Sequence, residues 1–178
     1  MKDKWEIIFS GVGGQGLVLS GSFLGEIAAV NHNKYAVLTT TYGTEARGTF
    51  TKSDVIVSSK PIYFPEVLQP DLVLSLAQVA YDRYADKLDE NAILLYDSDL
   101  VTDVKESKAK QYGFPFTRLA REMGRESMAN MIALGTIIKM TGVVDHEAFY
   151  SLIEKRFAES PKVVELNRAM FDKGMSLV

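Results

Sequence analysis

The sequence has 178 residues, of which 47% are hydrophobic and 24% charged, with a formal net charge of −3. This composition is typical of a globular chain, and we expect a single domain over residues 1–178. The absence of cysteine excludes disulfides, a thiolate nucleophile and a cysteine-held iron–sulfur cluster in this sequence.

The charges are interspersed rather than grouped, so we expect no nucleic-acid partner. No apolar stretch reaches the roughly 18 residues that a transmembrane helix requires, and the N-terminal residues are too polar for a signal peptide. Two histidines give little support for a metal centre. The sequence therefore predicts a cytoplasmic protein with no metal and no membrane partner.

Predicted strands and helices alternate through the first half of the chain. Strands are predicted at 5–10, 35–40, 50–58, 71–76 and 92–96, and helices at 17–30 and 78–88. Three prolines between residues 61 and 70 exclude a central strand or a long helix there. Short runs that are apolar on both faces are typical of a parallel sheet covered on both sides. We therefore expect an α/β fold with a three-layer α/β/α, Rossmann-like, mostly parallel sheet.

The last third of the chain is predicted to be helical. Helices are expected at 116–123 and 126–140, the second of them buried and ended by Gly142 in a left-handed conformation. Asp145 is expected to cap the next helix, and Ser160 with Pro161 to begin the last one.

A glycine-rich turn follows the first predicted strand. It contains Gly11, Gly13, Gly14, Gln15 and Gly16. A turn between a strand and a helix directs backbone N–H groups and the helix N-terminus toward one point, which attracts phosphate groups. These five residues are therefore candidate cofactor-binding residues. The alternative interpretation is that the glycines only let the first helix pack closely on the first strand.

An NAD site requires an acidic residue at the end of the second strand to hold the ribose. The second predicted strand is instead followed by threonine and tyrosine, and the first carboxylate after it is Glu45. This departure argues against NAD. A stand-alone Rossmann-type nucleotide-binding oxidoreductase remains the alternative function.

A second candidate cluster, formed by Tyr42, Glu45 and Arg47, follows the second predicted strand. In a parallel sheet this cluster lies at the same carboxyl edge as the glycine turn, where ligands of open α/β sheets bind. Arg47 is suited to clamp a carboxylate or phosphate through two hydrogen bonds. An internal ion pair between Glu45 and Arg47 is the equally weighted alternative.

Other polar residues have simpler structural interpretations. Asp97 and Asp99 follow a strand and either form a carboxylate pair or cap a turn, of which the cap is the commoner arrangement. Asn130 lies within an apolar helix and, if buried, needs a hydrogen-bond partner, for example in a loop that it anchors. His32 is interpreted as a helix-terminal polar residue. The sequence contains no recognisable set of nucleophile, base and orienting group, so no catalytic residue is assigned.

Together these motifs resemble the gamma subunit of 2-oxoacid:ferredoxin oxidoreductases over nearly the whole chain. The joint occurrence of the glycine turn and the Tyr42–Gly48 motif at this spacing carries the resemblance. Supporting segments are Lys60-Pro61-Ile62, Pro70-Asp71, Asn130 with Leu134-Gly135, and Glu165-Leu166-Asn167. The chain departs from the family at Thr49, where a second glycine often follows Arg-Gly.

The resemblance implies one subunit of a complex that uses thiamine diphosphate, iron–sulfur clusters and coenzyme A. The complex oxidatively decarboxylates a 2-oxoacid to an acyl-CoA, with 2-oxoglutarate favoured here, and passes electrons to ferredoxin. Thiamine-binding and iron–sulfur subunits are the implied partners, and no cofactor is expected on this chain alone. A homo-oligomeric scaffold that uses exposed Tyr63 and Phe64 is a third hypothesis.

Overall fold

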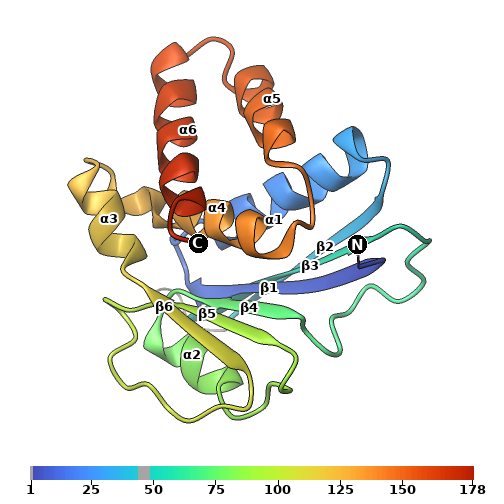
Figure 1. Ribbon diagram of the computed structural model, residues 1–178, viewed down its shortest axis with the longest axis vertical. Helices are drawn as coiled ribbons and strands as arrows, with labels where there is room; N and C mark the ends of the chain where they lie inside the picture. The colour runs from blue at the N-terminus through green and yellow to red at the C-terminus, as the bar shows by residue number, and fades with distance from the viewer. Residues whose placement is uncertain (1, 44–48) are drawn as a thin grey trace.

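The computed structural model describes residues 2–43 and 49–178, which form a sheet between two layers of helices (Figure 1). The strands are β1 (Lys4–Val12), β2 (Tyr35–Tyr42), β3 (Phe50–Ser58), β4 (Leu72–Ser75), β5 (Ile93–Asp97) and β6 (Lys110–Phe114). The α-helices are α1 (Leu17–Glu26), α2 (Gln78–Tyr84), α3 (Phe116–Glu122), α4 (Ala129–Thr141), α5 (His146–Arg156) and α6 (Pro161–Met175). A π-helical turn, η1 (Ile27–Asn31), continues α1, and a 3-10 turn, η2 (Glu126–Met128), precedes α4.

The strand order is β2-β3-β1-β4-β5-β6, and β1, β4, β5 and β6 pair in parallel. The predicted α/β fold with a mostly parallel sheet is confirmed. The third strand departs from it, because β3 runs antiparallel to both β1 and β2. Residues 43–49 alone connect β2 to β3, and a parallel crossover needs a dozen or more residues. Because β1 and β2 are both antiparallel to β3, they run in the same direction as each other.

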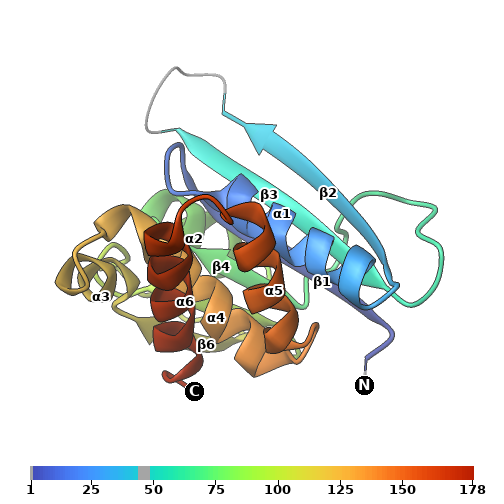
Figure 2. The ribbon, with the colours of Figure 1, turned by 90° about the horizontal axis from the view of Figure 1, so that it is seen from above.

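The two faces of the sheet have separate hydrophobic cores. Ile7 and Phe9 of β1 point into the larger core, under α1, α4, α5 and α6, whereas Ile8 points into the smaller core under α2. This alternation follows from the period of two in a strand. Figure 2 shows α5 and α6 stacked over α1 and α4, on the face opposite to α2. None of the helices in the described residues is long and apolar enough to cross a membrane.

Several predicted boundaries were wrong by a few residues, and one strand was missed. The strand β6 is a five-residue edge strand of sequence Lys-Gln-Tyr-Gly-Phe, which lacks an apolar run. It forms because it pairs with β5 along its whole length. The helix predicted over 78–88 ends at Tyr84, although Leu88 is still buried in the smaller core. The predicted N-cap at Asp145 is confirmed, whereas the side chain of Ser160 makes no capping hydrogen bond.

Helices α4 and α6 pack with their backbones in contact. A Cβ atom added to Gly135 of α4 would collide with the carbonyl oxygen of Phe171, and one added to Gly174 of α6 would collide with that of Ile132. Thr136 Oγ1 donates a hydrogen bond of 3.0 Å to the Gly174 carbonyl across this contact. The two glycines therefore set the distance between α4 and α6.

We predict that Gly135→Ala destabilises the chain by about 1–3 kcal/mol, because the added methyl group overpacks a backbone contact. Gly25→Ala is the matched control in α1, since its added Cβ would meet only Ala36 Cβ, at 3.8 Å. The control should gain about 0.5–1 kcal/mol from reduced backbone freedom in the unfolded chain. Urea unfolding of both variants measures the difference, and equal stabilities would contradict the proposed role of Gly135.

Candidate functional site

The glycine turn connects the end of β1 to the start of α1 in left-handed backbone. Gly14 has φ 93° and Gly16, the N-cap residue of α1, has φ 72°. Glycine adopts this conformation without the steric cost that other residues meet. The N-terminus of α1 carries no side-chain cap. The turn therefore leaves the helix N-terminus without a capping oxygen.

The side chain of Gln15 holds the turn from within. Its Oε1 accepts a hydrogen bond of 2.8 Å from the Val12 backbone N–H, and its Nε2 donates one of 2.7 Å to the Leu76 carbonyl after β4. A Cβ atom on Gly11 would collide with Gln15 Oε1. A side chain at Gly11 would therefore displace the Gln15 amide, which ties the ends of β1 and β4 together.

Asn130 holds the other side of the turn from α4. Its Nδ2 donates hydrogen bonds to the Gly16 carbonyl at 3.2 Å and to Ser20 Oγ at 3.0 Å. A Cβ atom on Gly16 would lie 2.5 Å from this same Nδ2. The prediction that a buried Asn130 anchors a loop is confirmed.

Gly13 differs from the other glycines of the turn. Its φ lies outside the left-handed region, and an added Cβ atom would meet nothing within 4 Å. Neither backbone conformation nor packing within the described residues requires glycine at this position.

Two cavities are lined in part by residues of the turn. The first, of about 350 Å³, is lined by residues of the turn together with Tyr42 and Thr51. The second, of about 390 Å³, is lined by Gly14 and Gln15 together with Leu100, Thr117 and Glu126. The structure therefore brings Tyr42 beside the glycine turn, as the sequence predicted. Glu45 and Arg47 lie outside the described residues.

We call this region the glycine edge and define it as Gly11–Gly16 with Tyr42. Since β1 and β2 run in the same direction, their C-terminal ends meet at one edge of the sheet. Tyr42 is 68% exposed there. The glycine edge offers backbone N–H groups, an uncapped helix N-terminus and one tyrosine hydroxyl, which suits an anionic ligand better than a cation.

Asp97 and Asp99 act as helix caps. Asp97 Oδ2 accepts a hydrogen bond of 2.9 Å from the Thr117 N–H, and Asp99 Oδ2 accepts one of 2.9 Å from the Arg118 N–H, at the start of α3. Burial raises the pKa of Asp97, although the hydrogen bonds from Thr117 and Asp99 oppose the shift. Asp97 Oδ1 also accepts a hydrogen bond of 2.9 Å from the Asp99 N–H, so the predicted turn cap is confirmed, and the two carboxylates additionally cap the start of α3.

The remaining polar candidates are also structural. His32 Nε2 accepts a hydrogen bond of 3.0 Å from the Asp145 N–H, which links the end of η1 to the start of α5. In the part of the chain that the structure describes, no cluster of three or more histidine, aspartate or glutamate side chains is suited to hold a metal ion.

We predict that Asn130→Ala destabilises the chain by about 1–3 kcal/mol, because Ser20 and Gly16 lose a buried hydrogen-bond donor. Asn167→Ala is the matched control, since among the described residues the Asn167 amide bonds only the Val163 carbonyl of its own helix. Hydrogen exchange should accelerate at the glycine turn in the first variant alone. Unchanged exchange at the turn would show that Asn130 does not hold it.

Comparisons with known proteins agree with this architecture. Residues 6–177 match the family model described as pyruvate ferredoxin/flavodoxin oxidoreductase. The chain is 42% identical to the 2-oxoglutarate synthase subunit KorC of Methanocaldococcus jannaschii, over 98% of this chain and 94% of the relative.

Two solved structures share the fold. The keto/oxoacid ferredoxin oxidoreductase gamma subunit of Geobacter sulfurreducens superposes with a TM-score of 0.87 at 39% identity, over 98% of this chain and 96% of that one. The 2-oxoglutarate:ferredoxin oxidoreductase of Magnetococcus marinus, solved with 2-oxoglutarate, coenzyme A and succinyl-CoA bound, superposes with a TM-score of 0.89 at 24% identity. That match covers 99% of this chain and 31% of the other.

The family predicted from the two sequence motifs is therefore confirmed over the full length of the chain. The chain belongs to the pyruvate ferredoxin/flavodoxin oxidoreductase family, as a gamma-type subunit of a 2-oxoacid:ferredoxin oxidoreductase.

Proposed function

We propose that this chain is the gamma subunit of a complex that oxidises 2-oxoglutarate to succinyl-CoA, and that its glycine edge faces coenzyme A. The observation that carries the second part is Gly13. A glycine that nothing among the described residues requires is explained if a group outside the chain approaches its backbone closely.

The chemistry of the glycine edge supports a phosphate-bearing ligand. Backbone N–H groups at the uncapped start of α1 favour a pyrophosphate or phosphate, which coenzyme A carries. Tyr42 lines the cavity beside the turn, and among the described residues it is the side chain that we propose to contact this ligand. Glu45 and Arg47, which follow Tyr42 closely in the sequence, are proposed to complete the site, with Arg47 as the phosphate clamp. The Magnetococcus relative was solved with coenzyme A bound, which is consistent with this proposal.

The other cofactors are proposed to lie on partner subunits. This sequence contains no cysteine, so a cysteine-ligated iron–sulfur cluster needs ligands from elsewhere. We assign thiamine diphosphate and the clusters to other subunits, ferredoxin to the acceptor role, and the whole of residues 1–178 to one gamma domain. The isolated chain is then inactive, and its cytoplasmic location stays a prediction.

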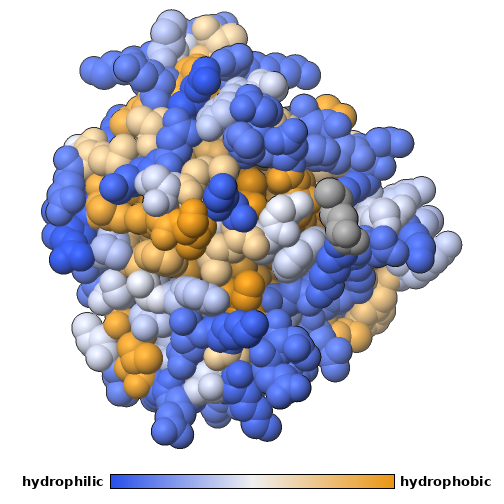
Figure 3. Space-filling model, viewed as in Figure 1, coloured by the Kyte–Doolittle hydropathy of each residue, from blue (hydrophilic) through white to orange (hydrophobic). Residues whose placement is uncertain are grey.

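The surface of the chain is consistent with contacts to other subunits. Figure 3 shows hydrophobic residues gathered across the middle of one face, surrounded by hydrophilic residues. Contiguous apolar surface of this kind marks interaction sites in soluble proteins. Tyr63 is 93% exposed and Phe64 54%, and their part in a contact with another chain stays a prediction. A stand-alone nucleotide-binding oxidoreductase is not favoured, since the full-length relatives are subunits of complexes.

Substituting Gly13 tests the coenzyme A proposal. We predict that Gly13→Val leaves the stability of the isolated chain within about 1 kcal/mol of the original, because the side chain enters open space. In the assembled complex the same variant should raise the KM for coenzyme A at least tenfold. Gly14→Ala is the contrasting variant, since its φ of 93° makes any side chain strained in the chain itself.

The outcomes of the Gly13 experiment separate two roles of the glycine edge. A raised KM with normal assembly supports contact with coenzyme A. Loss of assembly in size-exclusion chromatography assigns the edge to a partner subunit and overturns the coenzyme A role. An unchanged KM in a fully assembled complex leaves Gly13 without either role.

The substrate is tested on the complex purified anaerobically through a tag on this chain. We predict that ferredoxin reduction dependent on coenzyme A is fastest, in kcat/KM, with 2-oxoglutarate, and at least tenfold slower with pyruvate and 2-oxoisovalerate. Omitting coenzyme A is the control. Preference for pyruvate or 2-oxoisovalerate would contradict the substrate assignment without affecting the family.

A further inference from the structure

A groove on the face of the sheet that is opposite to the larger core has no role in the function proposed above. It encloses about 380 Å³ on the side of the sheet that α2 covers. Its walls come from β1, β3, α2 and the segment 67–70. It therefore lies away from the larger core and is distinct from the glycine edge, since the two share no lining residue.

Three cations line this groove in a chain whose net charge is −3. Lys52 of β3 forms an ion pair with Asp54. Arg83 and Lys87 have no carboxylate partner among residues 2–43 and 49–178. The Arg83 guanidinium instead lies 4.1 Å from the centre of the Phe50 ring. Among the described residues, two positive charges on one wall therefore have no ion-pair partner.

The basic residues near the end of α2 line the groove, whereas the acidic residues beside them in sequence act on a cation outside it. Arg83 lies in the last turn of α2 and Lys87 in the turn that follows it, and both line the groove, where like charges repel. Asp82 forms a 2.7 Å ion pair with Lys105 outside the groove, and Asp86 also acts on Lys105. The carboxylates that are nearest in sequence therefore serve a different cation. An anion between Arg83 and Lys87 would relieve their repulsion.

Tyr84 adds an uncharged donor to the same wall. Burial, followed by the negative charge of Asp54, raises the pKa of Tyr84 to about 12, so its hydroxyl keeps its proton at neutral pH. That hydroxyl has no hydrogen-bond partner in the described part of the chain. A protonated phenol beside two cations is suited to donate to an anionic oxygen.

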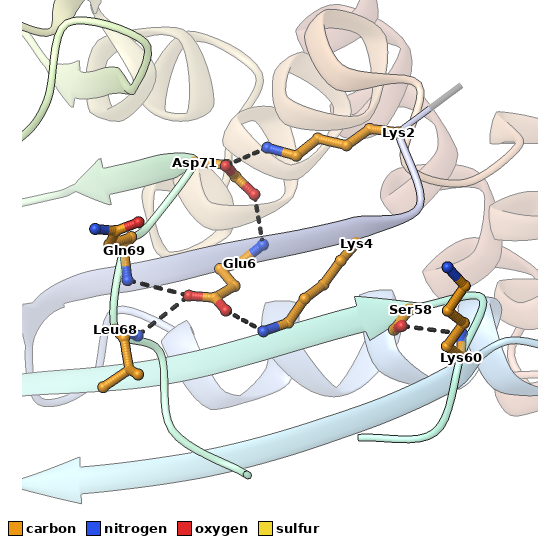
Figure 4. Close-up of polar contacts among 8 residues, drawn as sticks. All are labelled: Lys2, Lys4, Glu6, Ser58, Lys60, Leu68, Gln69 and Asp71. Carbon is orange, nitrogen blue, oxygen red and sulfur yellow. Dashed lines mark hydrogen bonds and ion pairs between the residues drawn. The ribbon is translucent and has the colours of Figure 1, made fainter. Parts of the chain in front are cut away.

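The rest of the groove is apolar. Ile8, Phe50, Val67, Pro70 and Leu88 line it beside the cations. The wall at 67–70 is fixed by Glu6, whose carboxylate accepts hydrogen bonds from the backbone N–H groups of Leu68, at 3.1 Å, and Gln69, at 3.2 Å, and also pairs with Lys4 (Figure 4). The Glu6 carboxylate therefore fixes the backbone of the apolar wall at 67–70.

We infer that this groove binds a small organic anion, a phosphate or carboxylate group attached to an apolar or aromatic body. The anionic group lies between Arg83 and Lys87 and accepts a hydrogen bond from Tyr84. The apolar body lies against Ile8, Phe50 and Leu88, where it displaces water from hydrophobic surface. Phosphate and carboxylate share the same recognition chemistry here, and probes of both kinds distinguish them.

The test uses phenyl phosphate and benzoate as probes of the full chain, with inorganic phosphate and benzyl alcohol as probes that lack one half of the ligand. Binding is followed by calorimetry and by amide NMR shifts of Ile8, Phe50 and Leu88. Arg83→Gln with Lys87→Gln should weaken the better anionic probe at least tenfold. Lys139→Gln with Lys155→Gln removes the same charge from exposed positions that form no ion pair with any described residue, and should leave binding unchanged.

Each result decides for or against the inference. Binding of phenyl phosphate or benzoate that is lost only in the groove variant, with weak binding of both half-probes, supports it. Equal binding to the two double variants, or shifts outside the groove, overturns it. Equally tight binding of inorganic phosphate rejects the apolar body.

A partner subunit that supplies the anion is a separate outcome. Carbodiimide treatment of the assembled complex would then cross-link Lys87 to a carboxylate of that subunit. Such a cross-link, with phenyl phosphate and benzoate excluded from the complex, overturns the small-molecule inference. The proposed coenzyme A role of Gly13 is measured by a different assay, so failure of either proposal leaves the other standing.

Discussion

The structure depends on a left-handed turn that two amide side chains hold from opposite sides. Gln15 fastens the turn to the end of β4, and Asn130 fastens it to α4. Each amide occupies the space that a side chain on Gly11 or Gly16 would need. As a result, the positions of β1, β4, α1 and α4 are coupled through a few hydrogen bonds. The same coupling presents the free face of Gly13 and the start of α1 in one fixed orientation.

The glycines of the motif have different structural roles. The sequence pattern suggested a uniform phosphate cradle, with close helix packing as the alternative. The structure distinguishes the glycines: Gly11 leaves space for the Gln15 amide, Gly14 has left-handed backbone, Gly16 has left-handed backbone and leaves space for Asn130, and Gly13 does neither among the described residues. Gln15 of the motif makes hydrogen bonds within the chain, to Val12 and Leu76, so its presence beside the glycines is explained by the structure of the turn.

Sequence reasoning succeeded where a single local signal dominates. The apolar run of β3 was predicted with both of its ends, and the caps at Asp145, Asp97 and Gly142 follow from residue chemistry. It failed where pairing partners decide. The direction of β3 is set by the short connection from β2. The strand β6 has no apolar run to mark it in the sequence, and its pairing with β5 determines its conformation.

The candidate sites show the same limit. Tyr42 and the glycine turn were placed together by strand order, which periodicity and motif spacing can predict. The groove beside α2 was not foreseen, because its cations come from β3, from α2 and from the turn after α2, and β3 is distant from the other two in sequence. No local pattern reports that Arg83 and Lys87 lack carboxylate partners, since ion pairing is a property of the folded chain.

The contact between α4 and α6 has a consequence for synthesis on the ribosome. Helix α4 is buried over most of its length, and Phe171 of α6, stacked on Phe149 at 3.9 Å, belongs to the same core. At about 5–20 residues per second, α6 emerges a few seconds after α4. During that delay the part of α4 that packs on α6, at Gly135, has no cover from its own chain. Chaperone occupancy of the nascent chain is therefore expected to peak after α4 has left the exit tunnel and to fall once α6 docks.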